Sequence, residues 1–131
     1  MSRTAAVTYL WAPDDETATA TFDGLAEACE GYAFRFCWDV VETIRDIGGS
    51  NEFYERWARV GAFDRTGLDQ VLALIHQKRA AIVLVPDARM VGATTHVYHA
   101  VCERVEKYGG FVQVVNDGAN ASADTPTTEV G

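Results

Sequence analysis

Two arginines of this chain, each close to an aspartate, have the side-chain type that binds anions. Arg65 directly follows Asp64, and Arg89 follows Asp87 by two residues. Fixed guanidinium groups stabilise the negative charge that develops on a phosphate during its transfer. The two side chains are therefore candidates for an anion- or DNA-binding site. Ion pairs with Asp64, Asp69 or Asp87 explain the same residues equally well, so both interpretations stay open.

A second set of side chains has a spacing that could suit a metal ion. His96, His99 and Glu103 would share one face if their segment is helical. Protein zinc sites normally have four ligands, or three and a water, and the sequence suggests no further ligand for this set. A solvated polar face is the better interpretation. We therefore expect no metal site and no cofactor.

The elements that must position these residues begin with short hydrophobic runs typical of strands. These runs are Ala5–Trp11, Phe34–Val40, Ala80–Val85 and Phe111–Val115. Aromatic residues alternate with polar ones through the second run, which predicts a strand with a buried aromatic face. The third run has no polar face, so we expect it at the centre of a sheet.

The segments between these runs have helical periodicity. Asp14 or Asp15 is predicted to cap the first helix, and Gly31 to end it. The predicted buried stripes are Ala18, Phe22, Leu25 and Cys29, then Leu68, Val71, Leu72 and Ile75, then Val97, Val101, Val105 and Tyr108. Strands separated by helices predict an α/β fold of three layers, with a largely parallel sheet of four to five strands and helices on both faces.

The stretch from Asp64 through Gly92 resembles the middle of a serine recombinase catalytic domain, the resolvase/invertase family. In that family an Arg-Pro-x-Leu helix start leads through a basic turn into a hydrophobic strand that ends on an Asp-Arg-Leu-x-Arg element. Arg65 and Arg89 match arginines of this pattern, which makes them a residual phosphate site if the resemblance holds. Thr66 replaces the proline, and at least one arginine of the second element is missing in either register.

The same resemblance implies a nucleophile at the end of the first strand, in a Tyr-x-Arg-x-Ser pattern. Tyr9 matches the tyrosine, but Trp11 stands at the arginine and Pro13 at the serine. Proline has no hydroxyl, so the covalent attack on DNA that the family performs has no attacking group here. These positions are degenerate, and we expect the domain to have no catalytic residues. Thr8 is the nearest hydroxyl in that strand, but its register is wrong.

One segment is longer than the family pattern requires. It is predicted to form a helix, Asn51–Val60, with the aromatic residues Phe53, Tyr54 and Trp57. Aromatic residues often anchor protein interfaces, so these three are candidates for a partner-binding surface. In the alternative interpretation, Phe53 and Trp57 simply cover the sheet.

Composition and charge limit the classes of function. The chain has 131 residues and a formal net charge of −8, which is unfavourable for binding DNA phosphates. No apolar run is long enough to span a bilayer. The three cysteines are odd in number and widely spaced, as expected of a protein in the reducing cytoplasm rather than one with a disulfide framework. We expect one resolvase-like domain over residues 1–115 and a flexible tail over 116–131.

The sequence therefore predicts a catalytically inactive resolvase-like domain that acts as a protein-interaction or regulatory module. Its partner is expected to be another protein or a second copy of the chain, with DNA binding weak or absent. The alternative is an accessory protein of DNA recombination that keeps an arginine phosphate site. An enzyme of altered chemistry is a third class, but the sequence offers no pair of base and nucleophile for it.

Overall fold

The computed structural model describes residues 3–48, 66–91 and 95–115, and of residues 66, 95 and 96 it describes the backbone only. The elements in chain order are β1 Thr4–Ala12, α1 Asp15–Arg35, β2 Trp38–Ile47, α3 Thr66–His76, β3 Ile82–Val85, the 3₁₀ turn η2 Ala88–Met90, α4 Thr95–Lys107 and β4 Phe111–Val114. The described strands form one four-stranded sheet in the order β2-β1-β3-β4. Every adjacent pair is parallel.

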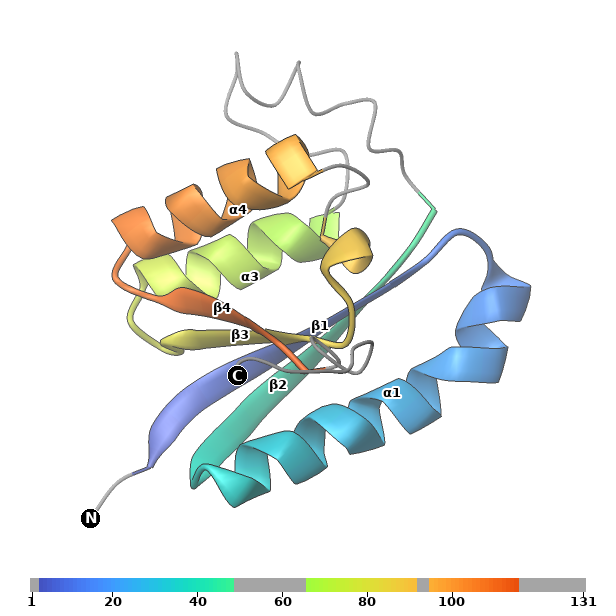
Figure 1. The fold of residues 1–131 in the computed structure, drawn as a ribbon, viewed down its shortest axis with the longest axis horizontal. Helices are drawn as coiled ribbons and strands as arrows, with labels where there is room; N and C mark the ends of the chain where they lie inside the picture. Colours follow the sequence, from blue (N-terminus) through green and yellow to red (C-terminus); the bar gives the residue numbers. More distant parts are fainter. Residues whose placement is uncertain (1–2, 49–65, 92–94, 116–131) are drawn as a thin grey trace, which may run out of the picture.

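The sheet lies between two helical layers (Figure 1), with α1 on one face and α3 and α4 on the other. Alternate residues of β1 serve the two layers, because successive side chains of a strand point to opposite faces. Val7 and Tyr9 join the core formed with α3 and α4, while Ala6 and Leu10 pack on the α1 side. The predicted three-layer α/β fold with a parallel sheet is confirmed.

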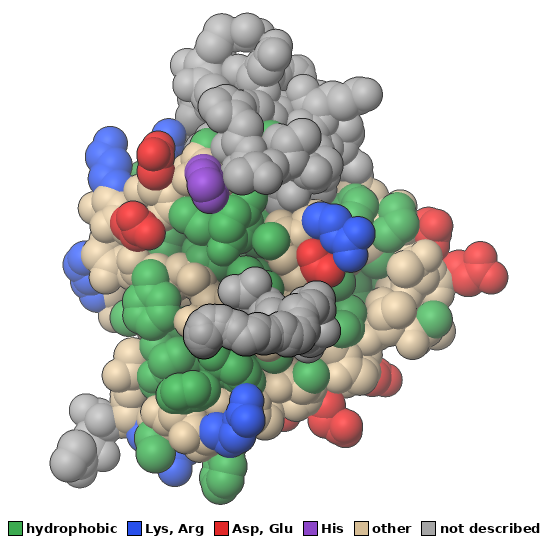
Figure 2. Space-filling view, in the orientation of Figure 1, with side chains coloured by type: hydrophobic (Ala, Val, Ile, Leu, Met, Phe, Trp, Pro, Cys, Tyr) green, Lys and Arg blue, Asp and Glu red, His purple; other side chains and the backbone are tan. Residues whose placement is uncertain are grey.

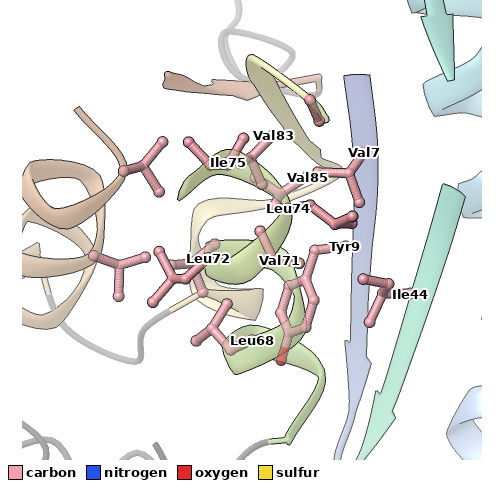
Figure 3. Packing of buried hydrophobic residues seen from close by; sticks show 14 residues of the cluster. Val7, Tyr9, Ile44, Leu68, Val71, Leu72, Leu74, Ile75, Val83 and Val85 are labelled. Carbon is pink, nitrogen blue, oxygen red and sulfur yellow. The ribbon is translucent and has the colours of Figure 1, made fainter. Parts of the chain in front are cut away.

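The larger core lies between the sheet and α3 (Figure 3), where Leu68, Val71 and Ile75 point toward Tyr9, Val83 and Val85. The predicted buried stripes of α3 and α4 are confirmed, with Tyr108 half-buried at the end of α4. The third hydrophobic run forms β3, which lies between β1 and β4 as expected of a strand with no polar face. None of the helices described is both long and apolar enough to cross a membrane.

The predicted strand Phe34–Val40 is wrong at its start. α1 continues through Gly31 to Arg35, and β2 begins only at Trp38. The helix continues because Ala33 extends the buried stripe of Cys29 by one further turn. Tyr32 and Phe36 pack against each other as neighbours four residues apart, with tilted rings whose centroids are 4.9 Å apart. The apparent alternation of a strand therefore came largely from residues on and just after a helix.

The predicted buried aromatic face is wrong for the same reason. Phe34 lies on the outer side of α1 and is 72% exposed, and Phe36 is 52% exposed. Trp38 is half-buried at the start of β2. The predicted cap at the other end of the helix is confirmed, because Asp14 accepts a hydrogen bond from the backbone N–H of Thr17 at 2.7 Å.

Cys37 connects α1 to β2 with a left-handed backbone, φ 60°. A residue with a Cβ pays about 1–2 kcal/mol for this conformation, and glycine does not. We expect Cys37→Gly to raise the free energy of unfolding by about 0.5–1 kcal/mol, since glycine's greater freedom in the unfolded chain offsets part of the gain. Urea unfolding measures the change, and Cys37→Ala, which keeps the Cβ, should leave stability nearly unaltered. A glycine variant no more stable than the alanine variant would contradict this prediction.

Candidate functional site

A hollow of about 290 Å³ opens where β1 and β3 end. The carboxyl ends of parallel strands are the usual place for a site in α/β folds. Pro13 follows β1 directly, and Asp87 lies two residues beyond the end of β3. The side chains that line the hollow are those of Trp11, Pro13, Thr17, Thr21, Leu25, Asp87, Arg89 and Met90.

The structure therefore brings three of the predicted site residues together. Trp11, Pro13 and Arg89 all line this hollow. Pro13 is exposed, so the position predicted for the nucleophile is open to solvent but carries no hydroxyl. Trp11 is half-buried, and its indole Nε1 donates a hydrogen bond to the carbonyl oxygen of Gly48 at 2.5 Å. That contact ties the end of β1 to the residue that follows β2.

Arg89 is held by Asp87 on the rim of the hollow. Its Nη2 lies 2.9 Å from Asp87 Oδ2 and its Nε 3.2 Å from Asp87 Oδ1, and its backbone N–H also donates to Oδ1 at 2.8 Å. The hydrogen bonds from Arg89 lower the pKa of Asp87, and the pKa of Arg89 is raised by the same partner. The Arg89 side chain is 82% exposed. An incoming phosphate could reach it but would have to compete with a fixed carboxylate.

Tyr9 does not line the hollow, and its side chain packs in the core between the sheet and α3. Its side chain is fully buried, and its hydroxyl donates to Asp46 Oδ2 at 2.8 Å. The other carboxylate oxygen, Asp46 Oδ1, accepts a hydrogen bond from the backbone N–H of Gly67 at 3.0 Å. Tyr9 and Asp46 thus connect β1 and β2 to the first turn of α3.

Gly67 is required at this contact. A Cβ on it would lie 2.6 Å from Asp46 Cγ, closer than van der Waals contact permits. This network was not predicted from the sequence, because Asp46 and Gly67 become neighbours only through the tertiary fold. Its one signal in the sequence was a glycine inside the first turn of a predicted helix, where glycine is otherwise unfavourable.

Two threonines, Thr17 and Thr21, line the hollow, and Thr8 is the nearest hydroxyl within β1. Thr8 is fully buried, and its hydroxyl has no hydrogen-bond partner among the described residues. Thr21 Oγ1 donates to the carbonyl oxygen of Thr17 at 2.8 Å. Asp14, beside Thr17, has a pKa lowered by the hydrogen bonds it accepts from that residue, which makes its carboxylate a weaker base.

Other predicted residues lie partly or wholly outside the described structure. Arg65, Phe53, Tyr54 and Trp57 are outside the described residues, as are the tail 116–131 and the side chain of His96. Within the described ranges, no group of three side chains is placed to hold a metal ion. His99 and Glu103 are exposed on α4.

No protein-family model matches the sequence, and a search of curated proteins finds no match. The fold is nevertheless shared with solved serine recombinase domains. The C-terminal catalytic domain of ISC1926 TnpA, an IS607-like serine recombinase, is 19% identical at a TM-score of 0.68, over 85% of this chain and 70% of its own. The N-terminal catalytic domain of TP901-1 integrase is 16% identical at 0.68, over 91% and 84%. A resolvase family site-specific recombinase from Streptococcus pneumoniae is 13% identical at 0.70, over 88% and 74%.

These similarities confirm the predicted resemblance at the level of the fold. The chain has the architecture of a serine recombinase catalytic domain, with a parallel sheet between helical layers. At such low identities the comparison establishes a shared fold, and function has to be argued from the residues of the site.

Proposed function

We propose that this chain is a catalytically inactive resolvase-like domain that works as a protein-interaction or regulatory module. Pro13 is the observation that carries the proposal. It occupies the position where the serine recombinase pattern has its nucleophile, and it lies exposed beside the hollow at the end of β1. A side chain without a hydroxyl cannot form the phosphodiester link to a DNA end.

The charges around the hollow support the same conclusion. Trp11 stands where the pattern has an arginine, and the guanidinium group of Arg89 forms an ion pair with Asp87. The chain as a whole carries a formal net charge of −8. Catalysis of phosphoryl transfer needs several fixed cations around the oxyanion, and here one exposed cation is already neutralised. The residues that remain in the hollow suit packing against another side chain better than holding a phosphate.

The proposed partner is another protein or a second copy of the chain, and the proposed location is the cytoplasm. We propose that residues 1–115 form the resolvase-like domain and that residues 116–131, from their composition, form a flexible tail. The alternative function, an accessory protein of DNA recombination with a residual arginine site, depends on Arg65 and Arg89. One observation favours this alternative: the Arg89 side chain is exposed at the carboxyl end of the sheet.

DNA binding as a function of salt separates the two functions. A fluorescein-labelled duplex of mixed sequence is titrated with the protein, and the anisotropy is followed at several salt concentrations. We expect weak binding with a salt slope equivalent to roughly one to three phosphate contacts. A slope equivalent to roughly six or more contacts would contradict the interaction module and support the accessory protein.

A matched pair of variants tests the arginine site directly. Asp87→Asn and Asp23→Asn remove the same charge, but only Asp87 neutralises Arg89, while Asp23 is exposed on α1. The proposed function predicts that the two variants raise DNA affinity equally and slightly. A much larger gain for Asp87→Asn would mean that Arg89 is a working phosphate contact.

A further inference from the structure

A row of aromatic rings lies at the amino-terminal end of the sheet, opposite the hollow. Tyr32 and Phe36 come from the end of α1, Trp38 from the start of β2 and Phe111 from the start of β4. Their ring centroids are 4.9 Å apart for Tyr32 and Phe36, 5.1 Å for Phe36 and Trp38, and 6.1 Å for Trp38 and Phe111. We call these four residues the aromatic row.

Two rings of the aromatic row are exposed in the described part of the chain, and the other two, Tyr32 and Trp38, are half-buried. Phe36 is 52% exposed and Phe111 is 42% exposed, and Phe34 beside them is 72% exposed. In Figure 2 hydrophobic side chains gather in the same region, at the lower left of the view, where Figure 1 places the end of α1 and the starts of the strands. Contiguous exposed apolar surface of this kind usually marks an interaction site.

A small hollow of about 210 Å³ lies between Phe34 and Trp38. Pockets for drug-sized molecules begin at about 300 Å³, so this hollow suits one anchoring side chain of a partner. Its rim carries Glu30 and Asp39 and one cation, Arg3. A single apolar anchor in a preformed pocket, surrounded by a polar rim, is the usual arrangement of an interface hot spot.

The charge of α1 indicates what kind of partner fits. Asp23, Glu27, Glu30 and Phe34 are spaced by four, three and four residues, so they form one stripe along the helix. All four are exposed. The stripe carries three acidic residues over about two turns and then ends on the aromatic side chain beside the hollow. A basic segment with an apolar anchor complements both parts, whereas a second copy would bring like charges together.

The aromatic row itself also favours a basic partner. The guanidinium carbon of Arg35 lies 5.3 Å from the centre of the Tyr32 ring, so one ring of the row already contacts a cation. The exposed rings of Phe36 and Phe111 offer the same type of contact to lysine or arginine from outside.

We propose that the acidic stripe of α1 and the aromatic row form a docking surface for a basic, amphipathic segment of a partner protein. An apolar side chain of that segment enters the hollow between Phe34 and Trp38, and its lysines or arginines lie along Asp23, Glu27 and Glu30. This inference rests on the proposed function, because it names the surface and the partner chemistry of the interaction module. The aromatic row and the hollow beside it lie at the end of the sheet opposite Pro13, so the docking surface and the loss of the nucleophile can be tested separately.

The probe is an 18-residue amphipathic peptide of leucine and lysine, with a peptide of leucine and glutamate as its control. Binding of the labelled peptides to the full chain is measured by fluorescence anisotropy, and sedimentation velocity reports the oligomeric state in parallel. We expect the lysine peptide to bind and the glutamate peptide not to bind. Equal binding of the two peptides, or binding of neither, would overturn the docking surface.

Three variants locate the binding. Phe34→Ala and Glu30→Lys should each weaken binding of the lysine peptide by roughly tenfold or more, as expected for an anchor and for a reversed charge. Ile47→Ala is the control, because Ile47 is an exposed hydrophobic residue at the far end of β2, and it should leave binding unchanged. Far-UV circular dichroism shows whether each variant keeps its helices.

The remaining outcomes also decide the proposal. Unchanged affinity in Phe34→Ala would overturn it, as would a dimer of the wild-type chain that Phe34→Ala dissociates, since the occupant would then be a second copy. Loss of peptide binding would not affect the DNA titration described above. A failure of the docking surface can therefore be told from a failure of the proposed function.

Discussion

Asp46→Ala is expected to lower the free energy of unfolding by about 2–4 kcal/mol. The substitution removes the carboxylate that accepts the Tyr9 hydroxyl at 2.8 Å and the Gly67 backbone N–H at 3.0 Å. A hydrogen bond to a charged group contributes about 1.5–3 kcal/mol, and a helix cap contributes about 1 kcal/mol. Both contributions are lost at once, and the first turn of α3 loses its connection to the sheet.

Urea unfolding with linear extrapolation measures this loss. Asp39→Ala is the matched control, because Asp39 is an exposed aspartate on the same strand and should change stability by less than about 0.5 kcal/mol. Asp46→Asn keeps an acceptor for Gly67 and should fall between the two. If Asp46→Ala were as stable as Asp39→Ala, the network of Tyr9, Asp46 and Gly67 would have no structural role.

Gly110→Ala is the second substitution with a large expected effect. Gly110 is buried between α4 and β4, and a Cβ there would lie 2.7 Å from the carbonyl oxygen of Ala81 and 2.9 Å from Cγ2 of Ile75. The Ala81 oxygen is a backbone atom that accepts a hydrogen bond from the Phe111 N–H at 3.0 Å, so it cannot move aside as the end of a flexible side chain can. We expect this overpacking to cost about 1–3 kcal/mol of stability, read as a lower midpoint of thermal unfolding.

Gly31→Ala makes the same chemical change where there is room. Nothing lies within 4 Å of the added Cβ, and Gly31 is exposed inside α1. Alanine in a helix interior is favoured over glycine by about 0.5–1 kcal/mol, so this variant should be more stable than the wild type. The two glycine variants should therefore shift stability in opposite directions, and a shift in the same direction would contradict the packing described here.

Helical periodicity was sufficient to predict α3 and α4, because their buried residues face a single core and repeat at helical spacing. β3 was predicted to be central because it lacks a polar face, and a strand covered on both sides needs none. The boundary between α1 and β2 was not predictable in the same way. The left-handed residue that ends α1 is Cys37 rather than a glycine, and Gly31 instead continues the helix.

The candidate site also has a part that could be predicted from the sequence and a part that could not. Trp11, Pro13 and Arg89 could be placed together from the sequence, because the ends of parallel strands meet at one edge of the sheet. The role of Tyr9 could not be foreseen, since it depends on Asp46 from β2 and Gly67 from α3. The aromatic row was missed because Phe34 and Phe36 were assigned to the inside of a strand. Whether Phe34 and Phe36 are exposed depends on where α1 ends, and tertiary contacts determine that end.

We expect this chain to be unable to link itself to DNA, and covalent capture measures this property. Purified protein is incubated with supercoiled plasmid, the reaction is stopped in detergent, and the products are separated by denaturing electrophoresis. Pro13 has no oxygen to attack a phosphodiester, and Thr8 is fully buried, so we expect no DNA to migrate with bound protein. A protein–DNA band that survives denaturation would contradict the account and would show that another hydroxyl of this chain acts as the nucleophile.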